Sequence, residues 1–88
     1  MEIIPIIIQS RSTGEKLGQV DLPSFCIMHM KSSSAATNAH TMKSYIEKKC
    51  GGLNIQAMFI GDKDISNELD VAQLENGDKG EIVITVIA

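Results

Sequence analysis

Residues 82–87 read Ile-Val-Ile-Thr-Val-Ile, and this stretch near the end of the chain decides the class of fold. Successive side chains of a β-strand point to opposite faces, so residues 82, 84 and 86 form one face and residues 83, 85 and 87 the other. Both faces are largely apolar. Residues 80–88 are therefore predicted to form a strong strand.

A second isoleucine-rich segment, Ile3–Ile8, lies at the other end of the chain. It is too short for a helix and rich in β-branched residues, which predicts a largely buried strand. Pro5 interrupts it and cannot donate a ladder hydrogen bond, a feature typical of a sheet edge or a bulge. Two registers remain open, because either the even-numbered or the odd-numbered isoleucines can face the core.

A hairpin is predicted to follow this first strand. Turn-forming residues at positions 10–14 end with Gly14, and residues 16–22 then carry the apolar side chains of a return strand. Leu17 is out of phase with Val20 and Leu22. A bulge at Gly18 would correct the alternation.

One amphipathic helix is predicted from Ser34, as its N-cap, to about Cys50. Its apolar residues recur at spacings of three and four, which gives one buried stripe: Ala39, Met42, Ile46 and Cys50. The pair Gly51-Gly52 can adopt the left-handed backbone conformation that ends a helix, and the positive charges of the lysines in the last turn interact favourably with the helix dipole.

The remaining segments are shorter. Residues 24–31 (SFCIMHMK) form an unusually apolar connection, interpreted either as a short extra strand or as a loop folded over the core. Residues 54–60 alternate as a strand that is apolar on most of both faces. Ile65 is expected to begin a very short strand, residues 69–74 a compact turn, and residues 75–78 a further turn.

These elements predict a single α+β domain over residues 1–88, with a mixed sheet of four to five strands packed on one main helix. The helix must cover one sheet face, since nothing else in the sequence can. The last strand is free to lie parallel beside the first. That arrangement is a β-grasp.

The order of elements resembles that of the ubiquitin-like family across nearly the whole chain. The matching segments are Met1-Glu2-Ile3-Ile4, Met58-Phe59-Ile60-Gly61, Ile65, Leu69–Leu74 and Glu81–Val86. Ubiquitin-like modifiers end in a flexible Gly-Gly tail that is activated and conjugated. This chain ends at Ile87-Ala88, so the expectation is a non-conjugated member of the family.

The resemblance also implies a partner-binding site. The position similar to the centre of ubiquitin's recognition patch is Met58, with Thr85 beside it on the last strand. The expected partner-binding residues on the sheet face away from the helix are Met58, Ile60, Val83, Thr85, Ile6 and Ile8. The alternative is that the segment containing Phe25, Ile27 and Met28 folds back over this face and buries it.

Composition and spacing exclude several other function classes. The net charge is −3 and only three residues are aromatic, so no nucleic-acid partner is expected. No apolar run approaches the roughly 18–20 residues of a membrane span. Two cysteines are too few for a disulfide framework and there is no signal peptide, which predicts a cytoplasmic protein.

No catalytic group, metal site or small-molecule cofactor is expected. His40 and Cys50 are separated by about 15 Å along the predicted helix, so they cannot join Cys26 and His29 around one zinc ion. Cys26 and His29, three residues apart in an extended segment, would point to opposite faces and cannot act as nucleophile and base.

The sequence therefore predicts a non-catalytic domain that binds a protein partner through its sheet face. A second hypothesis is a small structural or regulatory subunit of a larger complex, as the resemblance to ubiquitin-like proteins of bacterial secretion systems and multicomponent monooxygenases suggests. A third, a sulfur carrier or protein modifier, requires a longer natural C-terminus.

Overall fold

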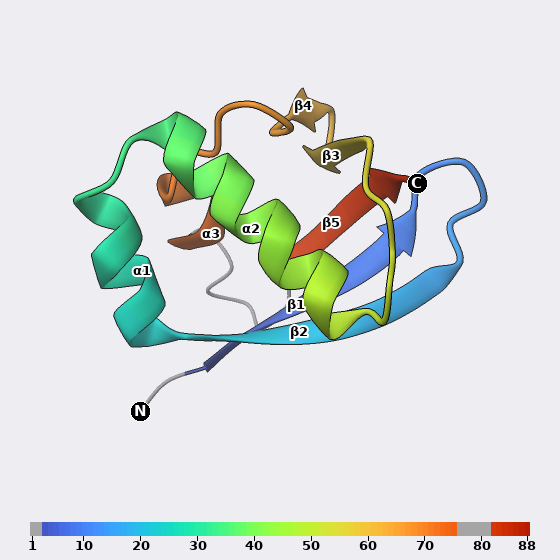
Figure 1. Cartoon of the computed structure of the whole chain (residues 1–88), viewed down its shortest axis with the longest axis horizontal. Helices are drawn as coiled ribbons and strands as arrows, with labels where there is room; N and C mark the ends of the chain where they lie inside the picture. Colours follow the sequence, from blue (N-terminus) through green and yellow to red (C-terminus); the bar gives the residue numbers. More distant parts are fainter. Residues whose placement is uncertain (1–2, 76–81) are drawn as a thin grey trace.

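A five-stranded mixed sheet and three helices make up the part of the chain described by the computed structural model, residues 3–75 and 82–88 (Figure 1). The strands are β1 (Ile3–Ser10), β2 (Lys16–Pro23), β3 (Ala57–Ile60), β4 (Lys63–Asp64) and β5 (Ile82–Ile87). The helices are α1 (Ser24–Lys31), α2 (Ala35–Lys49) and α3 (Ala72–Glu75). The predicted α+β class with a mixed sheet is confirmed.

The first and last strands lie side by side at the centre of the sheet. The strand order is β2-β1-β5-β3-β4, and β1 pairs with β5 in parallel, with Ile6 opposite Ile82 and Ile8 opposite Ile84. All other pairings are antiparallel. Helix α2 crosses one face of this sheet (Figure 1). The arrangement is compatible with a β-grasp.

The register of β1 places its even-numbered isoleucines in the core. Ile6 and Ile8 are completely buried, as is Ile84 beside them on β5. Helix α2 contributes the expected stripe from the other side, with Ala39, Met42 and Ile46 almost inaccessible to solvent. Ser34 caps this helix as predicted, because its Oγ accepts a hydrogen bond of 3.1 Å from the Thr37 backbone.

The hairpin contains the predicted irregularity. Ile8 is opposite Gly18 but Gln9 is opposite Lys16, so Leu17 is the extra residue of a bulge. Pro5 is opposite Asp21 of β2, but the pairing of β1 with β5 starts only at Ile6, so no ladder donor is needed from Pro5 on the β5 side.

The apolar connection after β2 is neither a strand nor a loop but the helix α1, which corrects both interpretations. Pro23 takes the N-cap position with φ −65°, an angle that its ring fixes, and the chain turns directly into a helix. Ile27 and Met30, three residues apart, face the core. The helix lies beside α2 at one end of the molecule, so it does not fold over the sheet face opposite α2 (Figure 1).

The second half of the chain differs in its strand bounds. The strand expected over residues 54–60 begins only at Ala57. Ile55 instead turns into the core, where its backbone N–H donates to Glu47 Oε2 at 2.8 Å. Ile65 follows β4 rather than beginning it, and the last three residues of the turn expected at 69–74 belong to α3. The turn expected at 75–78 lies outside the described residues, except for Glu75 at the end of α3.

Candidate functional site

The sheet face opposite α2, here called the outer face, carries the first candidate site. Ile3, Val83 and Ile87 are 56%, 38% and 44% exposed on this side of the sheet. Ile7 lies between Gln19 and Val83 in the strand register, is nearly buried, and is not a member of the main core cluster. The outer face therefore combines an apolar centre with exposed apolar residues around it.

Of the expected partner-binding residues, Val83 and Thr85 lie on the outer face. The expected placement is wrong for Met58, Ile6 and Ile8, which are fully buried on the side of α2. Ile60 is half-buried and packs against the core cluster. These residues therefore do not form a common exposed patch.

The physical reason is the register of β3. Met58 is opposite Val86, whose side chain faces α2, whereas Phe59 is opposite Thr85 on the outer face. A shift of one residue along a strand exchanges its two faces. The side chain that β3 presents beside Thr85 is accordingly Phe59 and not Met58.

Arg11 organises one end of the outer face. Its guanidinium lies over the Phe59 ring, 3.9 Å from the ring centroid. Its Nη1 donates to the Thr85 hydroxyl at 3.0 Å and to the Gly61 carbonyl at 3.1 Å. Three contacts hold this exposed cation in one position, because a guanidinium is planar and can stack and donate at the same time.

Asp64 adds an acidic side chain close to Arg11. The pKa of its carboxyl is lowered, first by a hydrogen bond with the Ser66 side chain, then by the Ser66 backbone N–H at 2.8 Å, and also by the charge of Arg11. The carboxylate therefore stays ionised at neutral pH. Arg11 and Asp64 give this end of the outer face two fixed opposite charges.

Neither Arg11 nor Phe59 was identified as a site residue from the sequence. Arg11 is in the turn after β1 and reaches residues on β3 and β5 only because these strands are neighbours in the sheet. An arginine and an aromatic residue 48 positions apart carry no local spacing signal. Only the strand order could have indicated this contact.

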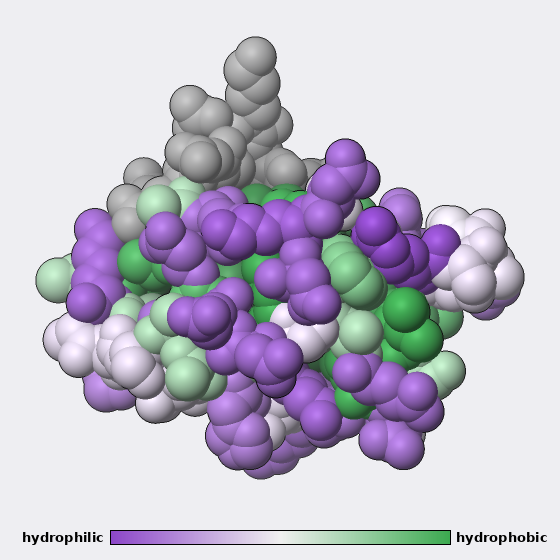
Figure 2. Space-filling view, turned by 90° about the horizontal axis from the view of Figure 1, so that it is seen from above, coloured by the Kyte–Doolittle hydropathy of each residue, from purple (hydrophilic) through white to green (hydrophobic). Residues whose placement is uncertain are grey.

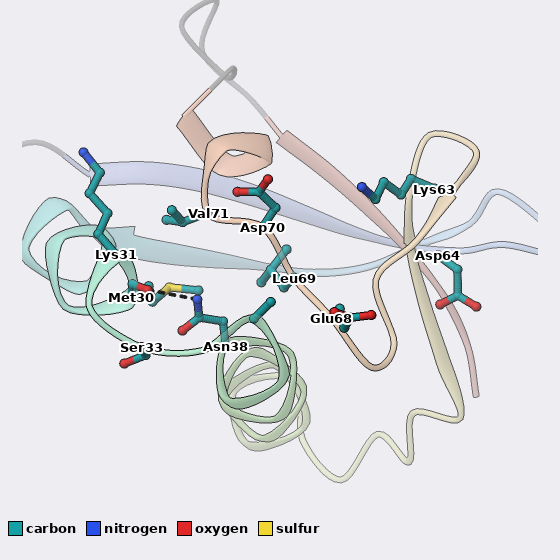
Figure 3. Close-up of a pocket in the computed structure, with 11 residues that line it drawn as sticks. Met30, Lys31, Ser33, Asn38, Lys63, Asp64, Glu68, Leu69, Asp70 and Val71 are labelled. Carbon is teal, nitrogen blue, oxygen red and sulfur yellow. Dashed lines mark hydrogen bonds between the residues drawn. The ribbon is translucent and has the colours of Figure 1, made fainter.

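A polar hollow of about 460 Å³ lies on another side, between the start of α2 and the segment that follows β4 (Figure 3). Its charged residues come from several elements, but Lys31 and Asp64 point away from its centre in Figure 3. Asn38, at its base, donates from Nδ2 to the Met30 carbonyl at 3.0 Å. Figure 2, seen from above the view of Figure 1, shows a mainly hydrophilic face with hydrophobic residues between the polar ones. The charged side chains of the polar hollow do not converge on one point in Figure 3, so the hollow is not built like a catalytic centre.

The described ranges, residues 3–75 and 82–88, contain neither a metal-ligand cluster nor a membrane-spanning helix. No group of three or more His, Cys, Asp or Glu side chains there could hold a metal ion. No helix there is long and apolar enough to cross a membrane.

Comparisons with protein-family models, curated proteins and solved structures give no match. The candidate function therefore depends on the geometry of the chain itself.

Proposed function

We propose that this chain is a non-catalytic, ubiquitin-like protein-interaction domain that binds a protein partner through the outer face of its sheet. The observation that carries the proposal is the set of exposed apolar residues, Ile3, Val83 and Ile87, on a face opposite the main helix. Several apolar residues exposed on one face of a small domain are typical of an interaction site.

Arg11 supports the proposal because it is exposed and already held in place. Arginine and aromatic residues are enriched among the residues that dominate binding energy at protein interfaces. Stacking on Phe59 and two hydrogen bonds restrict the guanidinium before binding, which reduces the entropy lost when a partner contacts it. The centre of the proposed surface is therefore Val83 and Thr85, with Arg11 at its edge.

Site-specific photo-crosslinking tests the proposal. A photoreactive amino acid is placed at Val83 on the outer face and, as a matched control, at the exposed Ser44 of α2. We expect one protein to crosslink through position 83 and not through position 44. The crosslinked protein is then purified and its affinity for the unlabelled chain is measured.

The variants Val83→Arg and Ile87→Arg should each weaken the affinity of that partner by about tenfold or more, since each adds a charge to an apolar contact. Both positions are exposed, so far-UV circular dichroism and the urea midpoint should remain close to those of the wild type. Equal crosslinking through Ser44, or unchanged affinity in both variants, would rule out this surface as the binding site.

A further inference from the structure

The structure contains a second hollow, on the side of the sheet opposite the outer face. A hollow of about 420 Å³, here called the α1–α2 groove, lies between these two helices and above the end of β2. Its lining residues are Leu22, Phe25, Cys26, His29, Met30, Thr41, Met42 and Tyr45. A volume in the range of about 300–1,000 Å³ is usual for a ligand site. The groove is thus large enough to receive a bulky apolar side chain.

The walls of the groove are mostly apolar, and its mouth carries an exposed aromatic residue. Phe25 is 58% exposed, and Met28, on the same helix, is 71% exposed. Tyr45 is held at the opposite wall because its hydroxyl donates to the Asp21 carbonyl at 3.1 Å. The two aromatic side chains therefore frame an opening that is already formed.

The charge around the groove is opposite to that of the chain as a whole. Residues 24–50 contain four lysines and one glutamate, a formal charge of +3, while the whole chain carries −3. Lys49 lies over the Tyr45 ring, with its Nζ 5.8 Å from the ring centroid. Lys48, three residues after Tyr45, continues the same side of α2.

Among the residues that the structure describes, no acidic side chain lines the groove. The carboxylate of Glu47, the one acidic group of this segment, accepts a hydrogen bond from the Ile55 backbone, away from the groove. The acidic residues of a partner would therefore be attracted by the lysines at the end of the groove. None of the described residues that line the groove would repel them.

We propose that the α1–α2 groove binds an acidic segment of a protein partner by receiving one of its large apolar side chains, while neighbouring Asp or Glu residues face Lys48 and Lys49. An anionic lipid surface is the other chemistry that would complement lysines and exposed apolar residues. A recessed groove favours the side chain, because membrane-surface binding instead uses a projecting amphipathic helix face.

Fluorescence polarisation with synthetic peptides tests this site. The probe is a labelled short peptide in which Phe and Leu alternate with Asp and Glu. One control peptide has Lys in place of the acidic residues, and another has Ser in place of the apolar ones. We expect the probe to bind about tenfold or more tightly than either control, and its affinity to fall as salt increases.

Three variants locate the binding. Phe25→Asp at the mouth, and Lys48→Glu combined with Lys49→Glu at the end, should each weaken probe binding about tenfold. Lys43→Glu reverses one charge of α2 where the combined variant reverses two, at a residue that is neither in the groove lining nor over the Tyr45 ring, and should weaken binding by much less than about threefold. Lys48 and Lys49 are exposed, so their combined variant should keep the fold even if Phe25→Asp does not.

The two cysteines provide an independent readout in the wild-type chain. Cys26 lines the groove, whereas Cys50 is outside it, so saturating peptide should slow alkylation of Cys26 and leave Cys50 unchanged. The proposal is overturned if the charge-reversed peptide binds equally well, if both groove variants bind as the wild type does, or if Cys26 is not protected. Binding to phosphatidylserine vesicles without binding to the probe would also overturn it. Val83→Arg should leave probe binding intact, which separates this test from that of the outer face.

Discussion

The contact between Gly18 and Cys50 yields a quantitative prediction about how the hairpin bulge packs on the end of α2. A Cβ added at Gly18 would lie 2.8 Å from Cys50 Sγ. That is at least about 0.7 Å too close, because even two nonbonded carbon atoms prefer about 3.5 Å or more and sulfur is larger than carbon. The substitution Gly18→Ala therefore forces the thiol or the bulge to move.

The expected cost follows from two opposing effects. Overpacking of a close contact costs about 1–3 kcal/mol in the free energy of unfolding. Gly18 does not have a positive φ, so alanine fits its backbone and restricts the unfolded chain, which returns about 0.4–1 kcal/mol. The difference between these two effects spans about 0–2.6 kcal/mol, and we expect Gly18→Ala to destabilise the domain by a value near the middle of that range, about 1–2 kcal/mol, in the wild-type background.

The substitution Cys50→Ala removes the atom that causes the clash. In that background Gly18→Ala should be neutral or stabilising by about 0.4–1 kcal/mol. Urea denaturation of the four proteins of this double-mutant cycle, followed by far-UV circular dichroism under reducing conditions, measures the coupling energy. A destabilisation by Gly18→Ala that disappears in the Cys50→Ala background would show that the clash with the Cys50 thiol causes it.

Gly14→Ala is the matched control for this cycle. Gly14 has φ 75°, and no described atom beyond its chain neighbours lies within 4 Å of an added Cβ, so the cost of Gly14→Ala comes from backbone strain and should not change with Cys50→Ala. If Gly18→Ala costs the same in both backgrounds, the steric explanation is wrong. An unchanged stability in the wild-type background would contradict it equally.

Three further predictions concern single polar contacts. Ser34→Ala should reduce the free energy of unfolding by about 1 kcal/mol in urea denaturation because α2 loses its N-cap. Ser34→Asp should keep most of the wild-type stability, because aspartate also caps helices well. Asn38→Leu should cost about 0.5–1.5 kcal/mol, since it removes one of two hydrogen bonds to the Met30 carbonyl, which keeps the Ser33 backbone N–H at 3.1 Å, and should speed amide hydrogen exchange in α1. Because the pKa of Asp64 is lowered in the folded state, its ionised carboxylate contributes to the free energy of unfolding at pH values above the ordinary Asp pKa. This contribution is lost as the pH falls through the lower, folded-state pKa. Ser66→Ala should raise the pKa of Asp64 in an NMR titration, and an unchanged pKa would show that the Ser66 side chain is not the main cause.

Local sequence rules were sufficient where a segment has one apolar face or a clear cap. Helix α2 has a single buried stripe, a serine N-cap and a glycine stop, and it lies where these signals predicted it. The bulge at Leu17 and Gly18 follows from a break in alternation that any buried hairpin must correct.

Local rules failed where a segment is apolar on all sides. In residues 24–31 the apolar positions fit a strand and a helix almost equally well, so neither period could be preferred. The segment β3 presents the same difficulty, since Met58, Phe59 and Ile60 are all apolar. Its inward face is set by pairing with β5, a contact about 28 residues away in sequence, so only the tertiary structure could place Phe59 on the outer face.

The helix α1 changes what the domain offers to partners. Had residues 24–31 covered the sheet, the outer face would be closed and no groove would exist. Because Ile27 and Met30 direct this segment to the core on the side of α2, the outer face stays exposed while Phe25 gains a position at the mouth of the groove. The two proposed surfaces therefore lie on opposite sides of the sheet. A variant on one surface should leave binding at the other unchanged, since their lining residues do not overlap.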